Sequence, residues 1–224
     1  MTNLALAALV FAVMHLFISG TTLRDVLIAR LGANVYRAAF SIASIAALWW
    51  LIQAWVGMRT PQVTALVGVR ALAALLMLVA FALVVLGLTT PGPTSVGGER
   101  LLDQDDNARG VHRITRHPFL WGVALWAAVH LVFNPEPANL LFFGCFLVVA
   151  GYGTFSIDGK RARQFGERWA PYAAKTSNLP FVAVAQGRNK LALGEIGLWR
   201  WLIVLAVFGA FAHFHARFFG LPPL

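Results

Sequence analysis

The sequence predicts an all-α, polytopic membrane protein, a bundle of about six transmembrane helices. Its 224 residues are 59% hydrophobic and only 12% charged, whereas a soluble domain is typically about 45–50% apolar and about 25% charged. Long apolar segments recur along the chain, and segments of about 17–25 apolar residues can cross the hydrocarbon core. The basic residues gather in alternate connections, which is typical of a chain that crosses the membrane repeatedly.

The candidate spans follow one another in order. The first lacks a basic leader and an obvious small-residue cleavage site, so we expect a retained span and not a signal peptide. The second and third are long apolar runs, the fourth begins at Pro118, and the fifth contains Cys145, the single cysteine. The sixth is close to the end of the sequence. The expected spans cover about residues 4–18 (or as far as 23), 35–56, 66–88, 118–133, 140–155 and 196–215.

The charge distribution predicts the orientation. Most of the 18 Lys and Arg residues lie in the connections after the first, third and fifth spans. Because basic loops stay in the cytoplasm, both termini should face outward, as in a multi-pass protein of a bacterial inner membrane. The net charge of +9 therefore reflects orientation in the lipid bilayer, and we expect no nucleic-acid partner. A single cysteine allows no disulfide within the chain, and no Walker A, GxGxxG or HExxH motif is present.

Two connections carry more sequence content than the others. Residues 89–110 are rich in Pro and Gly, which favours a mobile cytoplasmic connection. Residues 156–180 mix charged and aromatic side chains, which is typical of an amphipathic helix at the headgroup boundary. No soluble domain is expected in addition to the transmembrane domain.

Histidines in apolar segments are the candidate functional residues, because ionisable groups in hydrocarbon are costly. His15 lies in the first span, His130 near the outer end of the fourth, and His213 and His215 near the end of the sixth. Neutral imidazole is a common ligand of haem iron, and an aromatic neighbour such as Trp126 suits a porphyrin edge. Each histidine could instead bond a backbone carbonyl or a lipid headgroup.

His117 and Arg116 stand at the cytoplasmic start of the fourth span. Thirteen residues along a helix advance by about 220° and about 20 Å, so His117 and His130 cannot bind one iron together. We expect His117 and Arg116 to organise the cytoplasmic end of the helix bundle. Arginine contacts carboxylates and phosphates in pairs of hydrogen bonds, so Arg116 could meet haem propionates. It could equally be a positive-inside anchor.

Three blocks, in order, resemble the NnrU protein family: "MHLFISGTTLRDVLIARLGANVYRAAFS", "RITRHPFLWGVALWAAVHLVFN" and "IDGKRARQFGERWAPYAAKTSNLPF". The resemblance implies a single NnrU-like transmembrane domain over residues 1–224. The family's relatives include the plant 15-cis-zeta-carotene isomerase, a membrane protein that holds haem b. The match by motif implies iron ligands at His15 and His130, while Ala127 stands where the isomerase has a cysteine. NnrU proteins are linked to nitrite and nitric oxide metabolism in denitrifying bacteria.

The function that this resemblance implies is a membrane haem b protein. It would be a redox-dependent cis–trans isomerase of a polyene lipid, or a factor in nitrite or nitric oxide metabolism. The positions of the two histidines in the membrane argue against a shared iron, because the backbones of His15 and His130 should differ by roughly 10–15 Å along the membrane normal. Tilted helices tolerate much of that offset. The pair His130 and His213 is better matched in depth and is the fallback ligand pair.

Two other function classes stay open. The blocks "RHPFLWG" and "FGERWAPY" also resemble the core of isoprenylcysteine methyltransferases and membrane sterol reductases, which bind S-adenosylmethionine or a nicotinamide at the cytoplasmic face. This chain lacks the paired glutamates of the methyltransferases and has Asp158, Lys160 and Arg161 there. The third class is a membrane factor without a cofactor. The residues of the methyltransferase-like site would be His117, Pro118, Gly122, Gly166, Trp169 and Tyr172.

Overall fold

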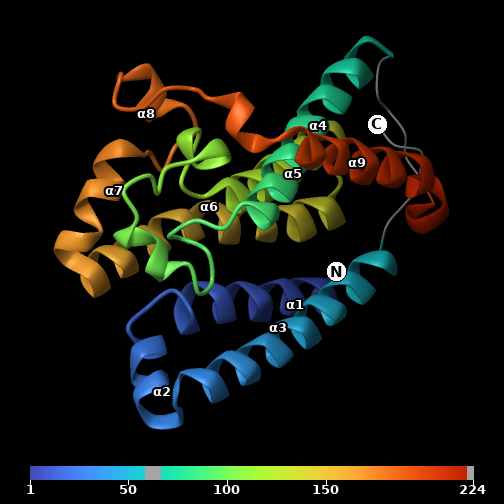
Figure 1. The fold of residues 1–224 in the computed structure, drawn as a ribbon. Helices are drawn as coiled ribbons and strands as arrows, with labels where there is room; N and C mark the ends of the chain where they lie inside the picture. Colours follow the sequence, from blue (N-terminus) through green and yellow to red (C-terminus); the bar gives the residue numbers. More distant parts are fainter. Residues whose placement is uncertain (59–66, 221–224) are drawn as a thin grey trace.

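The computed structural model describes residues 1–58 and 67–220, and every regular element in that part of the chain is helical (Figure 1). The prediction of an all-α fold is therefore confirmed. The nine α-helices of the described part are α1 Thr2–Val13, α2 Leu23–Leu31, α3 Ala33–Val56, α4 Val67–Thr89, α5 Pro118–Phe133, α6 Pro137–Phe165, α7 Ala170–Lys175, α8 Val182–Ala185 and α9 Leu198–Phe219. Short turns link them: the π-helical η1 Met14–Ile18 and the 3-10 turns η2 Glu99–Asp103, η3 Gly110–Arg113, η4 Gly166–Arg168 and η5 Leu193–Ile196.

All six predicted segments contain a helix, but they are not six equal spans. Four described helices are long and apolar enough to cross a membrane, namely α3, α4, α6 and α9. The first segment, α1 with η1, meets α2 at a bend of 78°, and this bent pair can be counted as a fifth span. Helix α5 has only 16 residues. The chain is a multi-pass membrane protein, and the count of six is approximate.

The end of the first span is a π-helical turn. The amide of Ser19 donates to the carbonyl of Met14 at 3.0 Å, a five-residue hydrogen bond. Such turns are rare and occur often at functional sites. His15 lies inside this turn. Two side chains of α6 hold the chain where it leaves the turn, because Lys160 Nζ donates to the Ser19 carbonyl and Ser156 Oγ to that of Gly20.

Helix α6 runs through the middle of the bundle. It packs against α5 on one side and against α1 and α3 on the other, while α4 packs between α5 and α9 (Figure 1). Small residues let α4 and α5 approach closely, as is common between membrane helices. A Cβ atom added at Gly122 of α5 would lie 2.8 Å from the Ala80 carbonyl oxygen of α4. A separate buried apolar cluster lies between α1, α3, α5 and α6.

Two predictions about the connections are wrong. Residues 89–110 are not a loose connection, because Leu102 and Ala108 are buried against Trp169 and Tyr172. Residues 156–180 are not one amphipathic helix. Helix α6 continues to Phe165 and ends at Gly166, whose positive φ of 44° is easily adopted only by glycine. The short turn η4 and helix α7 follow.

Candidate functional site

A polar cluster lies at the end of the bundle where the long connections meet, and Asp158 of α6 is its centre. The carboxylate accepts hydrogen bonds from His117 Nε2 at 2.7 Å and from Asn178 Nδ2 at 2.9 Å. Arg116 adds a bidentate pair, from Nε at 2.8 Å and Nη2 at 2.7 Å. Helix α5 begins at Pro118, whose fixed φ suits the first helical position. The preceding Arg116 and His117 are thereby set facing α6.

The cluster is largely shielded from solvent. His117 is 3% exposed, and burial lowers its pKa, although the hydrogen bond to Asp158 acts in the opposite direction. The guanidinium of Arg116 lies over the Trp169 ring at 5.7 Å and donates to the Thr176 carbonyl. Tyr172 is fully buried, and this burial raises the pKa of its phenol. His117 and Arg116 therefore share one carboxylate.

His112 has a structural place next to this cluster. Its ring is 2% exposed, and Nε2 donates to the Thr90 carbonyl at 2.8 Å. Burial lowers the pKa of His112, so the neutral form is held. Gly92 lies directly beneath the ring, because a Cβ there would come within 2.4 Å of the imidazole. His112 thus ties the end of α4 to η3.

Arg116 and His117 lie together at this end of the bundle, and their shared partner is an internal carboxylate. Asp158 takes the position that an external carboxylate or phosphate would occupy. The donors that could have met haem propionates are therefore already bonded. Sequence reasoning missed Asp158 and Asn178 as members of the site. The available signal was a lone acidic residue just before the basic run "GKRAR".

The two predicted iron ligands share one local arrangement. His15 Nδ1 donates to the Phe11 carbonyl at 2.8 Å, and His130 Nδ1 donates to the Trp126 carbonyl at 2.9 Å. A carbonyl can only accept, so Nδ1 carries a proton, and in the neutral ring Nε2 then keeps its lone pair. Neither Nε2 atom has a hydrogen-bond partner within the described residues. This is the tautomer in which imidazole coordinates a metal through Nε2.

The structure places these two histidines at different edges of one aromatic cluster. Ring contacts run from His15 to Phe11 at 4.2 Å, from Phe11 to Phe146 at 5.4 Å, from Phe146 to Trp126 at 5.5 Å and from Trp126 to His130 at 5.1 Å. In the described part of the chain, no direct ring contact joins His15 to His130. Trp126 is therefore adjacent to His130, and its place near a cofactor stays a prediction.

The two histidines of α9 have different surroundings. His213 is exposed and contacts Phe214. His215 is half-buried and its ring contacts Phe219 at 4.8 Å. The role of His213 as the fallback ligand stays a prediction.

An apolar cavity of about 450 Å³ lies between α4, α5 and α9. Its walls include Ala80 and Val84 of α4, Trp126 of α5, and Val207 and Phe211 of α9. Trp126 forms part of the cavity wall and also contacts the His130 ring. An apolar ligand in this cavity would therefore be one aromatic side chain away from an imidazole.

Only some residues of the methyltransferase-like alternative lie together. His117 bonds to Asp158, Trp169 lies beneath the Arg116 guanidinium of the same cluster, and Tyr172 is buried beside Trp169. Gly122 faces α4, where neighbouring atoms fill the space next to it. Within residues 1–58 and 67–220, no three His, Cys, Asp or Glu side chains gather as a metal site. A haem iron needs only one or two protein ligands.

Comparison with known proteins supports the family resemblance. The chain is 28% identical over 82 residues to the chloroplastic 15-cis-zeta-carotene isomerases of Zea mays and Arabidopsis thaliana. The matched region is 37% of this chain and 22% of each isomerase, so this chain spans only part of their length. No solved structure matches. The family model of the NnrU protein matches residues 3–223, and the chain therefore belongs to the NnrU protein family.

Proposed function

We propose that this protein is a membrane haem b protein that isomerises a polyene lipid. The observation that carries the proposal is the shared arrangement of His15 and His130, in which each Nδ1 donates to a backbone carbonyl and each Nε2 has no hydrogen-bond partner within the described residues. In metal sites a ligating histidine typically donates its other ring N–H to such an acceptor. The 28% identity to carotene isomerases supports the substrate class.

The donor set fits a haem. Two neutral imidazoles border a cluster of aromatic side chains, and an apolar, aromatic environment suits a porphyrin. Phe11 and Phe146 lie along the chain of ring contacts between the two histidines. The rings of Phe11 and Phe146 must move if one iron is to bind the Nε2 atoms of both His15 and His130. When bound, the haem would supply a redox-active iron that could perturb the π system of a polyene.

The chain's own residues would position the substrate. The cavity between α4, α5 and α9 is apolar and about 450 Å³ in volume, which suits part of an elongated polyene. Trp126 would keep the polyene in contact with the His130 side of the cavity. The cavity would also keep bulk water away from the double bond that rotates.

The absorption spectrum of the purified protein tests the cofactor. Protein from haem-replete cells, in a mild detergent, should show a Soret band that shifts on reduction with dithionite. His15→Ala and His130→Ala should each alter or abolish this band, and His213→Ala should leave it unchanged. A colourless wild type that takes up no haem would refute the proposal. A loss of the band in His215→Ala, with none in His15→Ala, would move the second ligand to α9.

An activity assay tests the reaction. Haem-loaded protein in lipid vesicles should convert 15-cis-zeta-carotene to the trans isomer when reduced and not when oxidised, with His130→Ala inactive. A haem protein without this activity that binds nitric oxide at the iron would favour the nitrite and nitric oxide role instead.

We also propose a bacterial inner membrane location with both termini outside, on the basis of the basic residues in alternate connections. Reporter fusions after Gly97 and Gly187 should report the cytoplasm, and a fusion after Pro135 should report the outside. A cytoplasmic signal at Pro135 would contradict this topology.

A further inference from the structure

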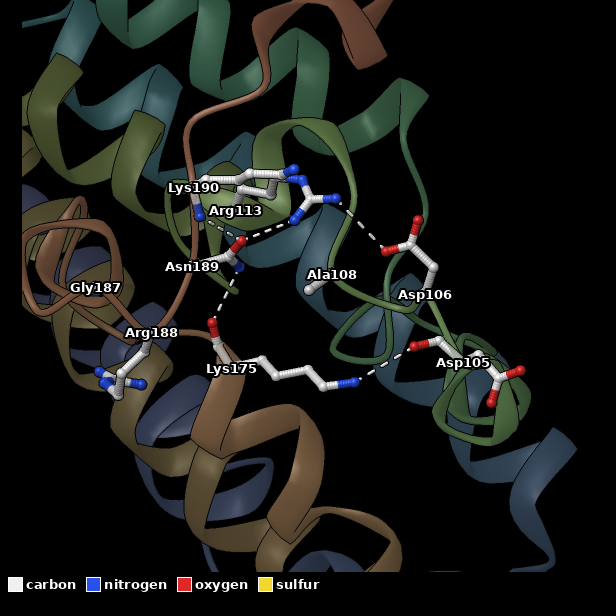
Figure 2. Close-up of a pocket in the computed structure, with 9 residues that line it drawn as sticks. All are labelled: Asp105, Asp106, Ala108, Arg113, Lys175, Gly187, Arg188, Asn189 and Lys190. Carbon is white, nitrogen blue, oxygen red and sulfur yellow. Dashed lines mark hydrogen bonds and ion pairs between the residues drawn. The ribbon is translucent and has the colours of Figure 1, made fainter.

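A second cavity, of about 460 Å³, lies at the loop end of the bundle between the connection before η3 and the segment that follows α8 (Figure 2). Four basic side chains line it: Arg113, Lys175, Arg188 and Lys190. Asp105 and Asp106 lie on the opposite wall. This cavity is polar and belongs to neither the histidines nor the apolar cavity of the proposed function.

The fold holds this basic wall in place. Gly187 has a positive φ of 69°, which lets the chain reverse after α8. Arg188 Nη1 then donates to the carbonyls of Ala174 and Thr176, where α7 ends. Asn189 Nδ2 donates to the Lys175 carbonyl at 3.0 Å. The turn is thereby fixed on α7, and Lys175, Arg188 and Lys190 are brought to one rim.

The charge of this wall is only partly compensated. Arg113 is neutralised, because Glu195 accepts a bidentate pair from it, each bond at 2.8 Å. No carboxylate of the described residues lies within ion-pair distance of Lys175, Arg188 or Lys190. Lys175 Nζ has one long contact, 3.4 Å to the Asp105 carbonyl. Figure 2 shows the Asp105 carboxylate pointing away from the Lys175 amine.

Hydrogen-bond donors are also left over. Arg188 uses Nε and Nη1 on Gln186, Ala174 and Thr176, and its Nη2 has no acceptor within the described part of the chain. The Lys190 amine likewise has none there. Ammonium and guanidinium groups that have no carboxylate partner are a usual means of binding a phosphate group.

We propose that this cavity binds a phosphate group, held by Lys175 and Lys190, while Arg188 ties the turn after α8 to the end of α7. The phosphate would displace water from the unused donors and balance the excess positive charge. The volume of about 460 Å³ is larger than one phosphate, so the rest of the ligand also fits. The phosphate is carried by an anionic lipid headgroup or by a soluble phosphate compound, and the cavity has the same chemistry for both.

The test compares two charge-matched variants of the full-length protein. Lys175→Gln with Lys190→Gln removes two cavity cations and spares Arg188, which holds the end of α7. Arg100→Gln with Arg163→Gln removes two exposed cations that do not line the cavity. Pyrophosphate binding in neutral detergent is measured by isothermal titration calorimetry. Retention of phosphatidylglycerol over phosphatidylcholine is measured by native mass spectrometry.

We expect the Lys175/Lys190 variant to bind about tenfold more weakly, since each lost charge-assisted bond is a large part of the binding free energy. The Arg100/Arg163 variant should bind as the wild type does. Selective loss of pyrophosphate binding assigns the cavity to a soluble phosphate, and selective loss of phosphatidylglycerol assigns it to a lipid headgroup. The proposal is overturned if the wild type binds neither probe, or if both variants weaken binding equally. Neither probe requires haem.

Discussion

Asp158→Asn is the substitution that best tests the polar cluster. Asparagine keeps the size of the side chain but removes the charge, and its NH₂ group would face the N–H donors of Arg116, His117 or Asn178. The side chains of Asp158 and Arg116 are only 18% and 13% exposed. Removing one partner of a buried ion pair typically costs about 3–5 kcal/mol. Since this pair is not fully buried, we expect a loss near the lower limit, about 3 kcal/mol of unfolding free energy.

Thermal unfolding followed by circular dichroism in detergent measures this loss. A chain of this size loses roughly 2–4 °C in midpoint for each kcal/mol, which predicts a drop of roughly 6–12 °C. Asp103→Asn is the matched control, because Asp103 pairs with Arg168 at the same end and their side chains are 59% and 49% exposed. Exposed pairs contribute about 0–1 kcal/mol. If Asp158→Asn destabilises no more than Asp103→Asn, the cluster is not a buried structural unit.

Three further predictions follow from packing and burial. Burial lowers the pKa of His112 in the folded protein, whereas in the unfolded chain His112 gains a proton near its ordinary pKa of about 6.5, so the protein should be fully stable above that pH and lose stability below it. The difference between the unfolding midpoints at pH 7.5 and pH 5.5 should therefore be smaller in His112→Asn than in the wild type. An unchanged difference would contradict this role of His112. Gly122→Ala should cost about 1–3 kcal/mol through overpacking against α4, whereas Gly144→Ala, with open space beside it, should be neutral or slightly stabilising; equal unfolding midpoints for the two variants would contradict the close approach of α4 and α5. Val207→Trp should fill the apolar cavity and stop polyene binding without changing the Soret band, whereas Val207→Ala should keep it; polyene binding that survives the tryptophan would place the substrate elsewhere.

Hydropathy and charge predicted the helices well because both depend on the local sequence. The expected start of the fourth span at Pro118 is the start of α5, and the expected end of the second at Val56 is the end of α3. The bend after η1 could not be predicted in this way. The side chains that bond to the chain at this bend, Ser156 and Lys160, are distant in the sequence.

The site was predicted less completely than the fold, for the same reason. Arg116 and His117 were expected at the cytoplasmic end of the helix bundle, but their partner Asp158 is more than forty residues away, and sequence spacing alone does not reveal such contacts. Tertiary packing also explains why the prediction for residues 89–110 was wrong. Their Pro and Gly content favours a mobile segment, yet Leu102 finds an apolar partner in Tyr172.

The Asp158 cluster also constrains the order in which the protein can mature in the membrane. Its donors are 42, 41 and 20 residues from Asp158 in the sequence, at Arg116, His117 and Asn178. A chain synthesised from its N-terminus therefore exposes Arg116 and His117 long before α6 supplies their carboxylate, and Asn178 arrives last. Until then, hydrated charges at the mouth of α5 must remain at the membrane surface, because burying them unpaired is costly. Insertion of the α5–α6 hairpin should thus stay reversible until α6 has supplied Asp158, and Asn178 then completes the cluster.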